Sequence, residues 1–131
     1  IRPNTEINPD VIGDYRDMKF PDKSFKLVVW DPPHLNHKES KTDLYLLTYG
    51  VLPQLDWEDD IKKGYEECMR VLEDDGVLIF KWSDQRISFK KVLSLFPDNP
   101  LFGTKTSQTS RSVTRWFCFM KIPRRITLNG T

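Results

Sequence analysis

Two short apolar runs constrain what this chain can fold into more than any other feature. Residues 27–30 (LVVW) and 77–80 (VLIF) are unbroken apolar runs, and polar residues follow each of them. A strand that is apolar on both of its alternating faces is typical of a parallel sheet with helices on both sides. We therefore expect residues 25–30 and 76–82 to form two buried strands of one sheet.

An amphipathic helix is predicted between these two strands. Asp56 is a favourable N-cap, and the acidic residues of the next turn suit the positive end of the helix dipole. Apolar residues then recur on one helix face: Ile61, Tyr65, Cys68, Met69 and Leu72. Gly64 would let this helix approach a sheet closely, and Gly76 is expected to end it in a left-handed conformation.

The remaining segments complete an alternation of strands and helices. Residues 9–14 are interpreted as a short strand, and Asp84 as the cap of a second helix that Pro97 ends. Residues 101–109 and 112–122 are expected to pair as an antiparallel hairpin. This order predicts an α/β fold with a mainly parallel sheet and a C-terminal antiparallel hairpin.

The composition fits one folded domain. Of the 131 residues, 38% are hydrophobic and 12% aromatic, which is more than a disordered segment carries. The longest apolar run, residues 116–120, is too short to cross a membrane. Cys68 and Cys118 fall in apolar segments, so we expect buried free thiols, typical of a reducing cytoplasmic compartment, with a disulfide or a reactive thiol as the alternative.

Charge is divided unevenly along the chain, although the net charge is only +1. Residues 1–75 carry 10 basic and 17 acidic side chains, and residues 76–131 carry 10 basic and 2 acidic ones. The basic half, with Lys105, Arg111 and Arg115, is a candidate surface for nucleic-acid phosphates. The alternative is a solvated basic face without a ligand.

Polar clusters follow three of the predicted strands. Asp14 ends the first, residues 31–34 (DPPH) end the second, and residues 81–84 (KWSD) end the third. In open parallel sheets, ligands bind beyond the carboxyl ends of the strands. The three clusters therefore predict one site at one rim of the sheet.

The residue types of Asp31-Pro32-Pro33-His34 suit the binding of an aromatic amine. The lone pair of an exocyclic amine on adenine or cytosine is delocalised into the ring, and acceptors for both N–H groups favour a localised, nucleophilic lone pair. The Asp31 carboxylate and the Pro32 carbonyl are such acceptors, and two successive prolines stiffen the turn. The His34 imidazole can stack on the flat base. All four residues are therefore candidate catalytic residues.

Three stretches carry a resemblance to a known family. They are residues 12–25 (IGDYRDMKFPDKSF), 27–35 (LVVWDPPHL) and 67–82 (ECMRVLEDDGVLIFKW). In this order, and with the terminal hairpin, they resemble the class I S-adenosylmethionine-dependent methyltransferases of the amino-methyltransferase branch, which carries a D-P-P-aromatic motif. The resemblance is strongest to small phage and bacterial proteins of this kind and covers residues 8–122.

The resemblance implies a Rossmann-like sheet, S-adenosylmethionine as the cofactor and roles for several residues. Asp14 would contact the adenine amino group of the cofactor, Tyr15 would lie near its ring, and Asp31 would face both the cofactor and the target amine. Lys81 and Trp82 would line the pocket. The implied substrate is a flipped or single-stranded nucleic-acid base, in DNA rather than RNA. Two alternatives stay open: a protein or small-molecule substrate, and an inactive fold that binds a partner.

Three features of the family are not found in this sequence. The glycine-rich cofactor loop and the acidic residue that ends the second strand do not occur before residue 9, and His34 stands where Tyr, Phe or Trp is usual. The resemblance thus implies a partial methyltransferase domain over residues 1–122, from the third strand onward, and a flexible tail over 123–131. We expect upstream residues or a partner chain to supply the two strands.

Two further signals lie in and beside the connection formed by residues 35–55. His34 and His37 have a spacing that metal ligands use, but no further ligand is near them in the sequence, so no metal is expected. Tyr45 and Tyr49 are candidates either for a small hydrophobic cluster or for a substrate lid.

Overall fold

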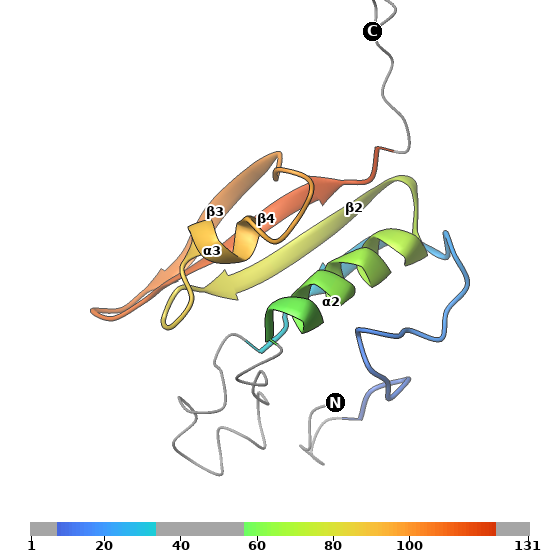
Figure 1. Cartoon of the computed structure of the whole chain (residues 1–131), viewed down its shortest axis with the longest axis horizontal. Helices are drawn as coiled ribbons and strands as arrows, with labels where there is room; N and C mark the ends of the chain where they lie inside the picture. Colours follow the sequence, from blue (N-terminus) through green and yellow to red (C-terminus); the bar gives the residue numbers. More distant parts are fainter. Residues whose placement is uncertain (1–7, 34–56, 123–131) are drawn as a thin grey trace, which may run out of the picture.

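The computed structural model describes residues 8–33 and 57–122, with the side chain of residue 106 excepted, and shows a mixed α/β fold (Figure 1). The elements are β1 (Phe25–Trp30), α2 (Trp57–Val71), β2 (Leu72–Ser83), α3 (Phe89–Leu93), β3 (Phe102–Gln108) and β4 (Val113–Met120). The predicted strand over 25–30, the helix after it and the terminal hairpin are all confirmed. The predictions for Asp56, residues 35–55 and residues 123–131 lie outside the described residues.

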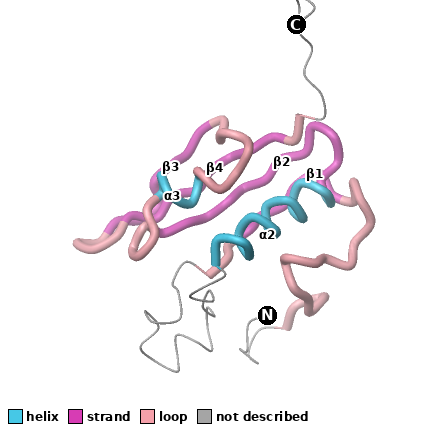
Figure 2. Tube along the Cα trace, in the orientation of Figure 1, coloured by secondary structure: helices cyan, strands magenta, loops and turns pink. Residues whose placement is uncertain are grey.

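The strands form one sheet with the order β1-β2-β4-β3 (Figure 2). β1 and β2 are parallel, with α2 as the crossover between them, whereas β4 is antiparallel to both β2 and β3. The carboxyl ends of β1 and β2 therefore meet at one rim of the sheet. The combination of a parallel pair with a C-terminal antiparallel hairpin is the arrangement that the sequence predicts.

The hydrophobic core lies on one face of the sheet, under α2 and α3 (Figure 1). Leu78, Phe80 and Trp82 of β2 alternate onto this face and are fully buried. Ile61, Tyr65 and Cys68 of α2 pack against them, as the helical spacing of these residues predicts. Aromatic rings fill much of the core, including the stacked rings of Tyr65 and Phe96, whose centroids are 4.3 Å apart.

Gly64 allows α2 to lie close to β1, as expected from the sequence. A Cβ atom at this position would be 2.6 Å from Cδ2 of Tyr15 and would also collide with the ring of Trp30. Both rings therefore occupy the space that a larger residue in the helix would need. This packing brings the loop that carries Tyr15 next to the end of β1.

The other face of the sheet is open within the described residues. Leu27 and Val29 are each 57% exposed, Phe102 is 62% exposed and Met120 39%. The prediction that the strand over 25–30 is buried on both faces is therefore wrong for this structure. The physical reason is that α2 and α3 both pack on the opposite face, so no described helix covers these side chains.

The segment 9–14 does not form the predicted strand. It has no partner strand among the described residues, apart from an isolated bridge between Asp14 and Asp17. Val11 and Ile12 are 61% and 72% exposed, so these apolar side chains are not buried. A strand needs a neighbour to satisfy its backbone hydrogen bonds, and no described segment lies beside this one.

Two predicted helix boundaries are also wrong. The left-handed residue after α2 is Asp75, with φ 64°, rather than Gly76, and β2 begins directly at Leu72. Ser88, not Asp84, caps α3, and its side chain accepts a hydrogen bond from the backbone N–H of Lys91 at 3.1 Å. Asp84 instead accepts a hydrogen bond of 2.7 Å from the backbone N–H of Val113, which ties the end of β2 to the start of β4.

Both cysteines are free and buried, as expected. Burial raises the pKa of the Cys68 thiol to about 12, so this thiol is a packing group rather than a nucleophile at neutral pH. None of the helices in the described ranges has the length and hydrophobicity needed to cross a bilayer.

Candidate active site

The candidate site is built around the end of β1. The strand ends at Trp30 because Pro32 and Pro33 have no N–H groups to continue the ladder. Pro32 is buried and Pro33 is half-buried, whereas the side chain of Asp31 is 38% exposed. The turn is thus held by packing while its carboxylate remains accessible. His34, the fourth predicted catalytic residue, lies outside the described residues.

Lys81 is brought next to Asp31 by the pairing of the parallel strands. Trp30 is in register with Phe80, so the residues that follow them, Asp31 and Lys81, lie side by side on the same face. The ammonium nitrogen Nζ of Lys81 is 3.4 Å from Oδ2 of Asp31. The same nitrogen lies 5.4 Å from the centre of the Trp116 ring, on the next strand. The predicted meeting of two strand ends at one rim is therefore seen in the structure.

Trp82 does not line a surface pocket in this structure. Its side chain is fully buried in the core, and its indole N–H donates a hydrogen bond of 2.9 Å to the carbonyl of Ile87. The expectation that Trp82 faces a substrate is therefore not met. The reason is the alternation of the strand, which points Lys81 to the open face and Trp82 to the helix-covered face.

The loop that contains Asp14 is fixed by an arginine two residues away. Both carboxylate oxygens of Asp14 accept hydrogen bonds from Arg16: Oδ1 from Nε at 2.9 Å and Oδ2 from Nη2 at 2.6 Å. The Arg16 backbone N–H also donates to Oδ1 at 2.9 Å. These bonds hold the pKa of the Asp14 carboxyl at about 2. Much of the acceptor capacity of Asp14 is thus already in use.

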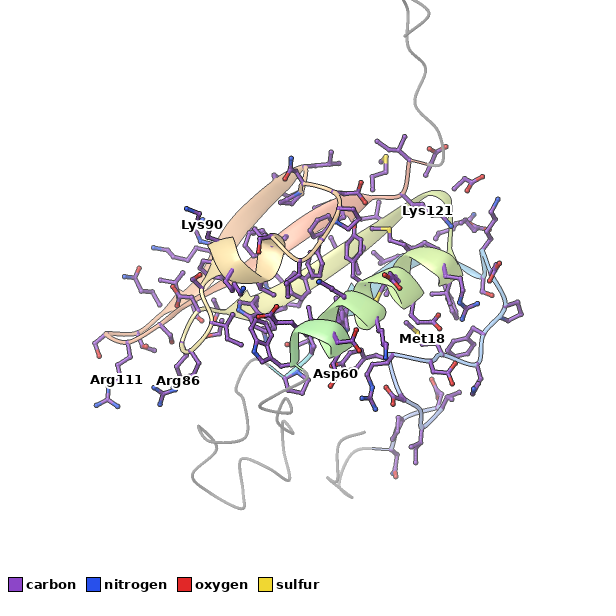
Figure 3. The ribbon with its side chains drawn as sticks, viewed as in Figure 1. Met18, Asp60, Arg86, Lys90, Arg111 and Lys121 are labelled. Atoms are coloured by element: carbon purple, nitrogen blue, oxygen red, sulfur yellow. The ribbon has the colours of Figure 1, made fainter. Side chains whose placement is uncertain are left out.

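Arg16 also anchors this loop to the first turn of α2. Its Nη1 donates to Oδ1 of Asp60 at 3.0 Å, and the Asp60 side chain is only 7% exposed. Figure 3 shows Asp60 at the end of α2 that lies nearest the rim. A buried carboxylate needs a partner of opposite charge, and Arg16 provides one. The sequence does not predict this ion pair, because a contact across 44 positions leaves no local pattern.

Tyr15 links the Asp14 loop to the Asp31 turn. Its ring centroid is 5.5 Å from that of Trp30, the residue directly before Asp31. Burial raises the pKa of the Tyr15 hydroxyl above its usual range, so the phenol is neutral at physiological pH. A cavity of about 690 Å³ adjoins this ring, lined by residues 11–15 and 17–20, Asp14 and Tyr15 among them. Two of the predicted clusters are therefore neighbours.

The predicted nucleic-acid residues lie at the same end of the sheet but not on the same face. The turn between β3 and β4 lies at the same end of the sheet as the rim, because Ser83 at the end of β2 pairs with Thr114 at the start of β4. Figure 3 shows Arg111 and Arg86 together at this end. Arg115 and Lys105 pair across β3 and β4 on the helix-covered face, and Arg115 lies 5.4 Å from the Phe89 ring. Tyr49 lies outside the described residues.

A metal site is not seen in the described part of the chain, where no group of three or more His, Cys, Asp or Glu side chains gathers. His34 and His37 lie outside that part. The described groups at the rim include a carboxylate, a proline carbonyl, an ammonium group and aromatic rings.

Two solved structures have a similar fold. The PH0226 protein from Pyrococcus horikoshii superposes with a TM-score of 0.59 at 14% identity, over 85% of this chain. TTHA0409 from Thermus thermophilus, a candidate DNA modification methylase, superposes with a TM-score of 0.56 at 16% identity, over 90% of this chain. The chain spans only 58% and 57% of the lengths of these two proteins.

No protein-family model and no curated protein sequence matches the chain. At such low identities the two structures show the fold alone. The described part of the chain therefore has the mixed α/β fold of these two structures, as the sequence predicts.

Proposed function

We propose that this chain belongs to a methyltransferase that transfers a methyl group from S-adenosylmethionine to an exocyclic amine of a nucleic-acid base. The observation that carries this proposal is the position of Asp31, Pro32 and Pro33. An accessible carboxylate and a rigid proline turn follow a parallel strand at the rim where α/β sheets bind ligands. The fold similarity to a candidate DNA modification methylase supports the same reaction class.

In this proposal the rim residues bind and polarise the amine. The Asp31 carboxylate accepts one N–H of the target amine, and the Pro32 carbonyl accepts the other. These two hydrogen bonds would localise the nitrogen lone pair for attack on the methyl group. Bound S-adenosylmethionine would supply that group from its sulfonium centre, with the electron pair of the carbon–sulfur bond left on sulfur. The surplus proton of the amine passes to Asp31 or to water. A fixed proline turn holds both acceptors in place before the substrate arrives.

The cofactor supplies the methyl group on a sulfonium centre. The residues that would hold it are Asp14 and Tyr15, which line the 690 Å³ cavity and are connected to the Asp31 turn through Trp30. A cavity of this volume is in the usual range for small-molecule sites. Arg16 already occupies both oxygens of Asp14, so a contact with an adenine amino group would use the lone-pair capacity that remains.

The proposed partner is a nucleic acid with an accessible base, preferably DNA. One observation favours it: Arg86 and Arg111 lie together at the end of the sheet where β1 and β2 finish (Figure 3). A base in a duplex hides its amine, so the base must be flipped or single-stranded. Phosphate contacts would make binding weaken steeply as the salt concentration rises.

A second candidate function is a binding module without catalysis. The observation that favours it is the Arg16–Asp14 pair, which engages the carboxylate that the cofactor would need. The two functions differ in their response to the cofactor, because only a methyltransferase must bind S-adenosylmethionine.

The experiment that tests the proposed function joins calorimetry with a methyl-transfer assay. S-adenosylmethionine and its demethylated product are titrated into the intact protein, and transfer of labelled methyl groups to single-stranded oligonucleotides is measured. Asp31→Ala is expected to abolish transfer while cofactor affinity stays within a few-fold, since Asp31 acts mainly on the amine. Asp22→Ala, which removes an exposed carboxylate of the loop before β1, is the matched control. Retained transfer in Asp31→Ala, or no cofactor binding by the intact protein, would refute the proposal.

A further inference from the structure

We propose that Lys81 is a positioning residue for Asp31, and that Trp116 holds Lys81 in place. The inference rests on the proposed function, because it assigns Asp31 as the acceptor for the target amine. It adds a role for two residues on neighbouring strands that do not themselves need to touch the substrate.

The three side chains form one row across three adjacent strands. Lys81 is directly paired with Trp116 in the antiparallel register of β2 and β4. On its other side, Lys81 follows Phe80, which is in register with Trp30, so Asp31 is its neighbour on β1. Paired residues on neighbouring strands point to the same face of a sheet. The backbone register alone therefore places Asp31, Lys81 and Trp116 together.

The distances show how Lys81 is held between the other two side chains. Its Nζ is 3.4 Å from Oδ2 of Asp31 and 5.4 Å from the centre of the Trp116 ring. An ammonium group within about 6 Å of an indole face is attracted to it. The indole therefore restrains the lysine from one side while the carboxylate attracts it from the other.

This ion pair engages one oxygen of the acceptor and leaves the other for the substrate. Lys81 donates to Oδ2, so Oδ1 is the oxygen that we assign to an incoming N–H group. A carboxylate that is free to rotate would present either oxygen in many orientations, and each lost orientation is an entropic cost at binding. Lys81 removes much of that freedom before the substrate binds.

The exposure of the pair favours a role in the site rather than in folding. The side chains of Lys81 and Asp31 are 36% and 38% exposed, so water screens their attraction. Exposed ion pairs of this kind add little to folding stability. A substitution of Lys81 should therefore leave the fold intact and change the orientation of Asp31.

The main experiment compares Lys81→Met with Lys81→Arg in the intact protein. Methyl transfer to single-stranded oligonucleotides that contain adenine or cytosine is measured at saturating S-adenosylmethionine. Lys81→Met is expected to lower kcat by about 10-fold or more, because small displacements of a catalytic group cost this much or more. KM for the oligonucleotide is expected to change less than kcat. Lys81→Arg keeps the charge and should recover most of the activity.

Two further variants separate positioning from other effects. Lys62→Met removes an exposed lysine of α2 and should leave kcat unchanged, which controls for the loss of one positive charge. Trp116→Leu keeps the strand but removes the ring, and should lower kcat in the same direction as Lys81→Met. A rise in KM for the oligonucleotide with unchanged kcat in Lys81→Met would overturn the proposal, because it would assign Lys81 to phosphate binding.

An NMR measurement tests the pair without any turnover. The carboxyl carbon of Asp31 is observed in protein labelled with ¹³C at aspartate, and its signal should move in Lys81→Met but not in Lys62→Met. An unmoved signal would show that the pair does not form in solution and would overturn the proposal. If the signal moves but the unchanged intact protein transfers no methyl group, the proposed function fails and the catalytic role of Lys81 fails with it, while the ion pair itself stands.

Discussion

The contacts of single residues at the rim could be predicted where strand pairing alone determines which residues are neighbours. Asp31 and Lys81 each follow an apolar run of a strand. The parallel register then places Nζ of Lys81 3.4 Å from Oδ2 of Asp31. The role of Arg16 was not predictable in the same way, because its link to Asp60 spans 44 positions and depends on how the loop folds over α2. The family resemblance implied that Trp82 lines the pocket, but the alternation of the strand places it in the core.

The Arg16–Asp14 pair predicts a pH-dependent contribution to stability. Hydrogen bonds from Arg16 lower the pKa of the Asp14 carboxyl from 3.8 to about 2. A lowered carboxyl pKa stabilises the folded chain above pH 3.8, and this stabilisation is lost as the pH falls towards 2. Asp14→Asn should therefore lower the free energy of unfolding at pH 6. The expected loss is only about 0.5–1 kcal/mol, because the ion pair is partly exposed and water screens it.

Urea unfolding at pH 6, 4 and 3 checks this prediction. The difference between the unchanged chain and Asp14→Asn is expected to shrink as the pH falls below 4. Asp10→Asn, at an exposed position on the same segment, serves as the control and should cause no such difference. If the free energies of unfolding of the unchanged chain and Asp14→Asn differ equally at pH 3 and pH 6, the result would contradict the assigned ion pair.

Helices and strands with a strong apolar periodicity could be predicted from the sequence. Segments whose structure depends on a neighbouring strand could not. α2 follows from its apolar face and β3–β4 from two strands around a polar turn. The segment 9–14 has the apolar residues of a strand, but without a paired neighbour it forms none. The end of α2 and the cap of α3 were misplaced by one to four residues, because several residues near each end are equally able to cap.

The packing of α2 on β1 gives a prediction at this scale. Gly64→Ala adds a methyl group where Tyr15 Cδ2 would be only 2.6 Å away, and Trp30 is also in the way. Overpacking of this kind costs about 1–3 kcal/mol, which outweighs the gain of up to about 1 kcal/mol from the better helix propensity of alanine. We expect a net loss in the free energy of unfolding, measured by urea denaturation.

Lys62→Ala, at an exposed position of the same helix, is the matched control for Gly64→Ala. Its free energy of unfolding should stay within about 0.5 kcal/mol of the unchanged chain. A Gly64→Ala chain that is more stable than the original would show that Tyr15 can move away from α2. The Tyr15–Trp30 contact, which connects the Asp14 loop to the Asp31 turn, would then not be rigid.

For the whole molecule, the sequence predicted the sheet but not the exposure of its second face. An apolar run identifies a strand that is suited to burial on both sides, but it cannot say which residues of a chain will cover each side. In the described part of the chain, α2 and α3 cover one face, and Leu27, Val29, Phe102 and Met120 of the other face are exposed. The Asp31–Lys81–Trp116 row lies at the rim of this open face, so the site borders an apolar surface.

An open apolar face of this kind predicts concentration-dependent self-association of the 131-residue chain. Leu27→Thr combined with Val29→Thr should weaken the association, because both side chains are 57% exposed and threonine is less apolar but remains favourable in a strand. Sedimentation velocity over a series of concentrations measures the effect. Val11→Thr combined with Ile12→Thr removes similarly exposed apolar groups outside the sheet and should leave association unchanged. Equal association of all three chains would contradict the assignment of the open face, since the apolar sheet surface would then contribute nothing to contacts between molecules.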